Sequence, residues 1–178
     1  MKYVLLLRGI NVGGKNKVSM AELKDLISRL GYENVITYIN SGNILFDSTD
    51  NIDTVNVNIS QILNSYPFKI NKVILTKQEY LEELENLPMW WKDELYRKDV
   101  LFYSDDIDYS IIKERINNMP LNDENVHFGK RAIFWGKFNE KNYLKTSYHK
   151  YLIKEPFYKY ITIRNGRTFM KIIELLDK

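Results

Sequence analysis

The order in which strand-like and helix-like patterns alternate along residues 2–75 constrains this chain more than any other feature of its sequence. Short apolar runs, of the kind that form buried strands, are separated by segments whose apolar residues recur at helical spacing. The strand-like runs are 2–7, 34–39, 43–46 and 68–75, and the helical segments are 19–30 and 52–66. The resulting order, β-α-β-β-α-β, predicts the split βαβ unit of a ferredoxin-like sheet.

Local signals mark the ends of these elements. Ser19 and, three positions later, Glu22 form a capping box that predicts a helix N-terminus, and Gly31 is a typical stop for the same helix. The residues Asn-Ser-Gly-Asn at 40–43 predict the turn of a β-hairpin. The second and third strands should therefore pair antiparallel.

The second half of the chain begins to repeat this order. A strand-like run at 99–104 is followed by a helical segment at 108–119 and by further runs at 124–129 and 131–138. This gives β-α-β-β once more. The basic stretch at 140–154 is expected to be helical.

Two more helices are predicted around this second half. Thr76 and Glu79 form a capping box at the start of the first of them. Residues 160–178 are expected to hold a short connection and then a C-terminal helix, whose apolar residues recur at helical spacing from Phe169 to Leu176.

We therefore predict an α+β fold of two ferredoxin-like subdomains of the βαββαβ type, related by duplication, with an added C-terminal helix. The predicted subdomains are residues 1–76 and 98–178. Residues 77–97 are predicted to form a linking helix and a Trp-rich connection.

The composition excludes several kinds of chemistry. With 44% hydrophobic and 28% charged residues, the 178-residue chain has a globular composition, which excludes disordered and fibrous classes. It contains no cysteine, which excludes disulfides, thiolate metal sites, iron–sulfur clusters and a cysteine nucleophile. Its 26 Lys and Arg and 23 Asp and Glu give a net charge of only +3, so attraction to an anionic partner has to come from local clusters.

No membrane segment, metal site or cofactor is predicted. The apolar run before Arg8 is too short for a secretory signal, and no run approaches the roughly 18 residues of a membrane span. We therefore expect a cytoplasmic protein without membrane contact. His127 and His149 fall in different predicted elements and no Asp-rich loop accompanies them, which is too few ligands for a metal ion.

The first candidate functional motif is the glycine-rich loop after the first strand. From Gly9 to Lys15 it fits the G-x-x-x-x-G-K frame of a P-loop, but Asn16 stands where a P-loop needs Ser or Thr to bind magnesium. The helix is expected to begin at Ser19, well after Lys15, and the neighbouring strands are expected to be antiparallel. The loop is interpreted either as an anion-facing turn, with glycine amides and Lys15 towards the ligand, or as a purely structural turn.

A second basic cluster, Thr-Ile-Arg-Asn-Gly-Arg-Thr, precedes the C-terminal helix. Arg164 and Arg167 flank Asn165, and the planar guanidinium group of arginine suits carboxylate or phosphate. A helix N-terminus also favours negatively charged ligands. The alternative is that these arginines form salt bridges that hold the C-terminal helix in place.

The basic stretch at 140–154 is a third candidate. Lys145, Lys150 and Lys154 are suited to a phosphate backbone. His149 beside a tyrosine offers acid–base chemistry, but such a pair is more often part of a solvated helix face. Ferredoxin-like RNA-binding modules stack bases on aromatic residues of their central strands, whereas the runs YVLLLR and NILF have aliphatic centres.

Three segments carry a resemblance to a known family. They are LLRGINVGGKNKVSMAELKDLI at 6–27, YINSGNILF at 38–46 and TIRNGRT at 162–168. Together they resemble the signature segments of a widespread bacterial family known as domain of unknown function sixteen-ninety-seven, over nearly the whole chain. The third segment departs from the family pattern at Gly166, where a Trp is expected. The resemblance implies a duplicated ferredoxin-like fold and a cytosolic, bacterial protein, and it implies no established activity.

From these residues we expect a protein that binds a small anionic or nucleotide-type ligand at a basic, glycine-rich site. The predicted site residues are Arg8, Asn11, Lys15, Asn43, Arg164, Asn165 and Arg167. No catalytic residue is predicted. One alternative is a nucleic-acid-binding module, which would use Lys145, Lys150 and Lys154 together with the same arginines. The other is a non-catalytic interaction protein.

Overall fold

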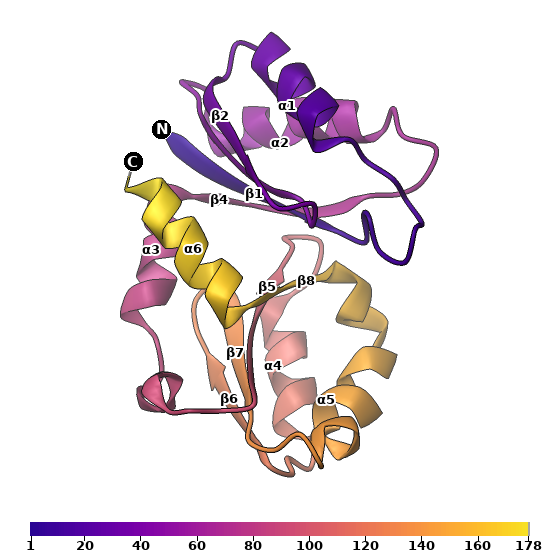
Figure 1. The fold of residues 1–178 in the computed structure, drawn as a ribbon, viewed down its shortest axis with the longest axis vertical. Coiled ribbons are helices and arrows are strands. Elements are labelled where there is room, and N and C mark those ends of the chain that lie inside the picture. Colours follow the sequence, from indigo (N-terminus) through magenta and orange to yellow (C-terminus); the bar gives the residue numbers. More distant parts are fainter. Residues whose placement is uncertain (178) are drawn as a thin grey trace. The chain divides into compact units, whose positions relative to one another are not determined.

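Two four-stranded antiparallel sheets organise the chain, each in a unit of its own (Figure 1). The structure is a computed structural model that describes residues 1–177. Residues 1–81 and 171–177 make up the first unit, and Glu82–Met170 make up the second.

The first unit has the predicted element order. Its elements are β1 (Lys2–Arg8), α1 (Met20–Arg29), β2 (Glu33–Tyr38), β3 (Asn43–Asp47), α2 (Ile52–Leu63) and β4 (Asn71–Thr76). The strands lie in the order β2-β3-β1-β4, and every neighbouring pair is antiparallel. This is the strand order of a ferredoxin-like sheet, with α1 and α2 on one face (Figure 1).

The core of the first unit lies between this face of the sheet and its two helices. Alternate residues of β1 enter it, because successive side chains of a strand point to opposite faces. The buried core residues include Tyr3, Leu5 and Leu7 of β1, Ile44 and Phe46 of β3, Leu23 and Ile27 of α1, and Val55 and Ile59 of α2. Val4 and Leu6, on the opposite face of β1, are also fully buried. Burial on both faces explains why β1 is continuously apolar in sequence.

The capping box predicted at Thr76 is confirmed, and at Ser19 the structure shows the N-cap hydrogen bond. The side chain of Ser19 accepts a hydrogen bond from the backbone N–H of Glu22 at the start of α1. At the start of α3 (Lys77–Glu85), the backbone N–H of Thr76 donates to the carboxylate of Glu79 at 2.9 Å, and the N–H of Glu79 donates to the Thr76 hydroxyl at 3.2 Å. Each cap satisfies backbone donors that the first helical turn leaves unpaired.

The second unit repeats the sheet of the first. Its elements are η1 (Met89–Lys92), β5 (Arg97–Tyr103), α4 (Tyr109–Asn117), β6 (Glu124–Phe128), β7 (Ala132–Lys137), η2 (Tyr143–Lys145), α5 (Ser147–Lys150), η3 (Leu152–Lys154), η4 (Pro156–Tyr160) and β8 (Ile161–Asn165). The strand order β6-β7-β5-β8 matches that of the first sheet position by position. The α+β fold with two ferredoxin-like subdomains is therefore confirmed, together with the C-terminal helix α6 (Gly166–Leu176).

Two details of the second half differ from the sequence prediction. Residues 161–165 were expected to be part of a connection, but they form β8, which pairs with β5 from Asp99↔Asn165 to Tyr103↔Ile161. The basic stretch was expected to be helical throughout, but it is a chain of short helices that is interrupted at Thr146, whose ψ of 155° is extended. This segment occupies the position in the element order that α2 has in the first unit.

In the second unit, the face of the sheet towards α4 and α5 has a core of its own, which includes Leu101, Ile112, Ile133, Trp135, Tyr148 and Ile161. Within the described residues 1–177, no helix has the length and apolar character needed to span a membrane. Among residues 1–177, no group of three or more His, Asp or Glu side chains is arranged to hold a metal ion.

Candidate functional site

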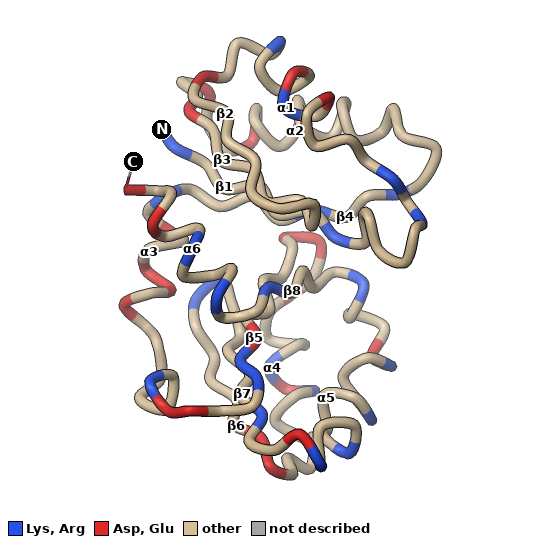
Figure 2. The backbone as a smooth tube through the Cα atoms, viewed as in Figure 1, with Lys and Arg blue, Asp and Glu red and all other residues tan. Residues whose placement is uncertain are grey.

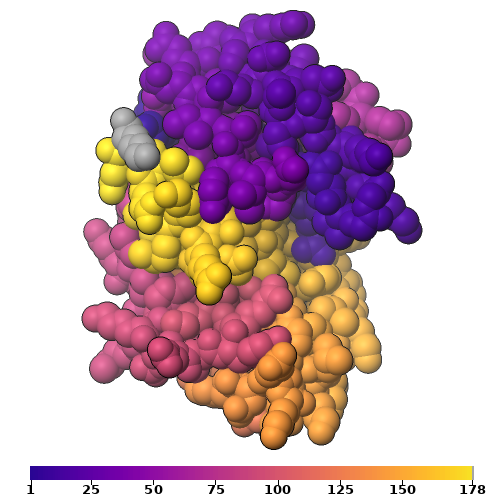
Figure 3. Space-filling view, in the orientation of Figure 1, coloured from indigo at the N-terminus to yellow at the C-terminus, as the bar shows by residue number. Residues whose placement is uncertain are grey.

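A short hairpin, which we call the finger (residues 12–17), follows β1. Val12 and Lys15 form an isolated antiparallel bridge, and the N–H of Lys15 donates to the carbonyl of Val12 at 3.0 Å. Gly13 and Gly14 between them have φ angles of 57° and 74°. Positive φ at both central positions is what a two-residue type I′ turn requires, and glycine adopts it without steric cost. The Gly-Gly pair is therefore the turn of a hairpin whose residues are all exposed, at the margin of the first unit (Figure 3).

Asn11 anchors the base of the finger. Its side-chain Nδ2 donates to the carbonyls of Val18 (3.0 Å) and Asn40 (2.9 Å), and its Oδ1 accepts from the N–H of Val18 (2.9 Å). The side chain of Asn16 donates to the carbonyl of Gly9 at 2.9 Å. Asn11 thus ties the finger to the β2–β3 turn.

Asn43, another of the predicted site residues, is fully buried at the start of β3. Its Nδ2 donates to the carbonyl of Tyr38 at 3.0 Å and to the hydroxyl of Ser41 at 3.1 Å. Beside it, Gly42 accepts a hydrogen bond from the N–H of Leu7 at 2.8 Å, and a Cβ at Gly42 would lie 2.6 Å from that of Leu7. The β2–β3 turn is therefore packed directly against the end of β1.

The finger is not a P-loop. A P-loop lysine sits where a helix begins directly after a strand of a parallel sheet. Here α1 begins at Met20, well beyond Lys15, and β1 is antiparallel to both of its neighbours, β3 and β4. Both features that were predicted to exclude a P-loop are present in the structure.

Cations gather at the finger end of the first unit (Figure 2). They are Arg8 at the end of β1, Lys15 and Lys17 on the finger, and Lys69 and Lys72 around the start of β4. Arg8 is paired in register with Asn71, which brings the two groups to the same end of the sheet. No acidic residue occurs within residues 1–21 or 54–78. The segments that carry these cations therefore contain no carboxylate side chain of their own.

The remaining predicted site residues belong to the second unit. Arg164 on β8 is only 7% exposed and donates to the carbonyl of Ile163 at 2.8 Å. The side chain of Asn165 accepts from the N–H of Thr168 at 2.8 Å, which caps the start of α6. Arg167 is exposed in the first turn of that helix. Arg164 and Asn165 thus both contribute to the fold of the second unit.

Gly166 adjoins these residues, at the position where a Trp was expected from the sequence resemblance. A Cβ at Gly166 would lie 3.1 Å from Cζ2 of Trp91. The Trp91 ring also packs edge-on against Phe134 and Phe169, with centroid distances of 5.4 and 6.1 Å. The indole of Trp91 therefore occupies the space beside Gly166.

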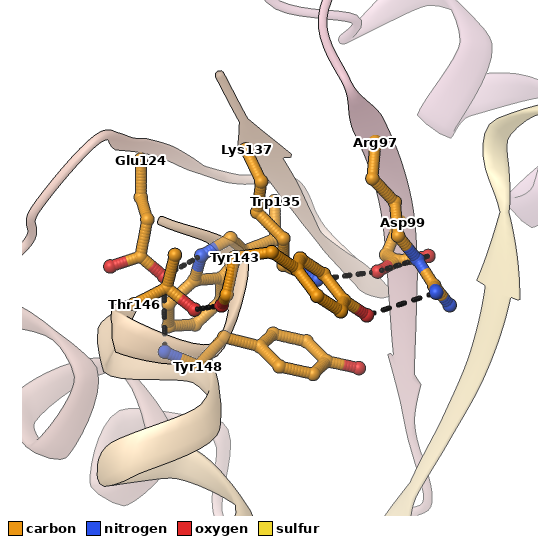
Figure 4. A network of polar contacts seen from close by, with 8 residues as sticks. All are labelled: Arg97, Asp99, Glu124, Trp135, Lys137, Tyr143, Thr146 and Tyr148. Atoms are coloured by element: carbon orange, nitrogen blue, oxygen red, sulfur yellow. Dashed lines mark hydrogen bonds and ion pairs between the residues drawn. The ribbon is translucent and has the colours of Figure 1, made fainter. Parts of the chain in front are cut away.

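A buried polar network lies at one end of the second sheet (Figure 4). Its residues are Arg97, Asp99, Glu124, Trp135, Lys137, Tyr143, Thr146 and Tyr148. Lys137 on β7 is in register with Arg97 on β5 and with Glu124 on β6. Asp99 accepts hydrogen bonds from Lys137 Nζ at 2.7 Å and from Arg97 Nε at 2.9 and 3.0 Å. The carboxylate of Asp99 therefore joins β5 to β7, and Glu124 on β6 is in register with Lys137.

Glu124 joins this network to α5. Its carboxylate accepts from the indole N–H of Trp135 at 2.9 Å and from the backbone N–H groups of Ser147 (2.7 Å) and Tyr148 (3.0 Å). The ammonium group of Lys137 lies 3.3 Å from the centroid of the Tyr148 ring, which adds a cation–π contact. The side chains of Glu124 on β6 and Lys137 on β7 therefore fix α5 to the sheet.

Burial dominates the electrostatics of the network. It lowers the pKa of Lys137, against the attraction of Asp99, and it raises the pKa of Tyr148. Burial, together with the charges of Lys137 and Arg97, also lowers the pKa of His149, whose Nε2 is buried without a hydrogen-bond partner in the described part of the chain. Lys137 and Asp99 are completely shielded from solvent, so their ion pair joins β7 to β5 in the interior of the second unit.

Sequence reasoning did not find Lys137, Asp99 or Glu124. A signal for the first two was present, because Lys137 follows Ile133 and Trp135 at alternate positions, and Asp99 precedes Leu101 in the same way. A charged residue in phase with the inward positions of a strand indicates a buried polar group that needs a partner. Lys69 and Lys72 were also missed, because only the β1–β4 pairing brings them to the finger end.

Two sheets of identical strand order define this chain as a duplicated ferredoxin-like α+β protein. The model of the family described as "Protein of unknown function (DUF1697)" matches residues 1–134, and the chain belongs to this family. The predicted family is therefore confirmed; the first two of the three sequence segments lie within the matched residues, and the third, at 162–168, lies beyond them.

One solved structure that the chain resembles is a conserved bacterial protein, SP0830, from Streptococcus pneumoniae. The two chains are 49% identical over 98% of each, with a TM-score of 0.93. A comparison with curated proteins found no match.

Proposed function

We propose that the first unit binds a small, multiply charged phosphate-type anion at its finger end. The supporting observation is the cluster of Arg8, Lys15, Lys17, Lys69 and Lys72 within segments that contain no acidic residue. Exposed cations bind a single charge weakly, because water and salt screen the interaction. A ligand with several adjacent charges, such as the phosphate chain of a nucleotide, engages several of these cations at once.

The fixed base of the finger supports this proposal. Asn11 holds the loop at Val18 and Asn40, and the type I′ turn sets the position of Lys15. Cations on a fixed hairpin lose less conformational entropy on binding than cations on a mobile loop. The proposed ligand contacts are Arg8, Lys15, Lys17 and Lys69, all in the first unit.

Isothermal titration with tripolyphosphate, with ATP in the absence of magnesium, and with orthophosphate tests this proposal. Tripolyphosphate and ATP are expected to bind, orthophosphate to bind more weakly, and all affinities to fall as salt is added. Lys15→Gln combined with Lys17→Gln should weaken the binding of tripolyphosphate about tenfold, since two charge contacts of the usual strength are lost.

The matched control is Lys145→Gln combined with Lys150→Gln, which removes the same charge from exposed positions of the second unit. This variant should bind tripolyphosphate as the wild type does. Equal weakening by both double variants would show a general effect of net charge and contradict the proposal. Absence of binding by the wild type would favour a non-catalytic interaction protein.

We also infer that the protein acts in the bacterial cytoplasm. The absence of cysteine and the similarity to a conserved bacterial protein support this inference. Fractionation of the native host, with the protein detected by antibody, tests it.

A further inference from the structure

The segment 141–160 of the second unit concentrates positive charge. It contains five lysines, at positions 141, 145, 150, 154 and 159, and one acidic residue, Glu155. Five lysines against one glutamate give +4, while the whole chain carries +3, so the rest of the chain sums to −1. Glu155 is itself within 4.0 Å of Arg115. This segment of 20 residues therefore carries a net charge of +4.

All five lysines are exposed, and they recur at intervals of four or five residues. Figure 2 shows the cationic positions of this segment along its outer side. Exposed apolar side chains lie between them: Leu144 (73% exposed), Tyr151 (45%) and Ile153 (41%). An exposed tyrosine between lysines combines a flat stacking surface with cations that contact phosphate.

The polar network holds this segment in one position. Glu124 accepts the first backbone N–H groups of α5, and Tyr148 packs on the buried Lys137. The outward lysines are therefore presented from a backbone that is anchored to the sheet. A basic segment without a fixed backbone would have to be ordered on binding, at a cost in free energy.

We propose that this surface binds single-stranded nucleic acid, with the lysines on the phosphate backbone and Tyr151 stacked on a base. This surface belongs to the second unit and the finger to the first, and the proposal does not depend on anion binding at the finger. Single strands are favoured over duplexes because their bases are free to stack on an exposed aromatic side chain.

Fluorescence anisotropy with a labelled oligonucleotide of about 15 nucleotides, at several salt concentrations between about 50 and 200 mM, tests the proposal. Each phosphate neutralised on a single strand contributes about −0.7 to the slope of log K against log salt. Five lysines therefore predict a slope of about −3.5, and Lys145→Gln with Lys150→Gln should reduce it to about −2.1. Lys24→Gln with Lys92→Gln, which removes the same charge from exposed positions outside both proposed sites, is the control and should leave the slope unchanged.

Substitutions of Tyr151 distinguish recognition of bases from simple charge attraction. Tyr151→Ala should weaken binding about tenfold without changing the salt slope, and Tyr151→Phe, which keeps the ring, should bind like the wild type. Thermal unfolding of each variant checks that the fold is retained.

Three outcomes would overturn the proposal. They are absence of oligonucleotide binding at the lowest salt concentration, a slope that does not respond to the Lys145 and Lys150 changes, and an unchanged affinity for Tyr151→Ala. Equal affinity for polyglutamate of the same length would also overturn it, because that result assigns the surface to acidic polymers in general.

Discussion

The ammonium group of Lys137 lies 2.7 Å from the carboxylate of Asp99, and neither side chain has any exposure to solvent. Desolvating two charges is costly, and their attraction offsets this cost only while both are present. Arg97 binds the same carboxylate from the exposed side of the network. The pair therefore makes the second unit sensitive to the loss of either charge.

Replacing Lys137 with methionine should lower the free energy of unfolding by about 3 kcal/mol, because Asp99 is left buried with only Arg97 as partner. Adding Asp99→Leu should recover part of this loss, since an apolar pair no longer requires desolvation of a charge. Urea denaturation of the two single variants and the double variant measures the coupling. Additive losses would show that the two residues do not act as a pair.

His149 should make stability depend on pH. Its pKa is lowered in the folded protein, so the unfolded chain binds the proton more readily. The contribution of the neutral imidazole is complete above the unfolded pKa of about 6.5 and is lost as the pH falls below it. Urea denaturation between pH 7.5 and 5 should show a smaller fall in stability for His149→Gln than for the wild type. Parallel profiles would contradict this prediction.

Gly42 and Gly31 form a matched pair for testing close packing. Both have positive φ, 81° and 85°, but a Cβ at Gly42 would lie 2.6 Å from Leu7 Cβ, whereas a Cβ at Gly31 would meet no atom within 4 Å. Gly31→Ala should cost about 1 kcal/mol from backbone strain alone. Gly42→Ala should cost a further 1–3 kcal/mol, roughly, from overpacking. Equal losses of stability in thermal unfolding would show that Leu7 moves aside without cost.

Substitutions of Ser19 and Lys15 distinguish the structural role of the loop from its proposed binding role. Ser19→Ala should lower the free energy of unfolding by about 1 kcal/mol, because the N-cap hydrogen bond to Glu22 is lost. Lys15→Ala should leave thermal stability unchanged, since Lys15 is exposed on the finger. A clear loss of stability in Lys15→Ala would show that the finger is held by that side chain as well as by Asn11.

Local patterns in the sequence were sufficient for most of the fold. The helix caps at Ser19 and Thr76 and the hairpin turn at 40–43 depend on residues within a few positions of one another, so they can be predicted without tertiary structure. The first β-α-β-β-α-β order follows from the apolar periods of the same segments. The repeat of that order in the second half then predicted the duplication.

Only the tertiary structure decided the rest, because it depends on contacts between residues that are distant in the chain. Residues 161–165 are a strand because β5 provides an open edge beside them, which their own short sequence does not reveal. Lys137 and Asp99, 38 positions apart, form an ion pair because β5 and β7 are neighbours. The sequence determined most of the strands and helices, and strand pairing determined which of their charges are buried and which are exposed.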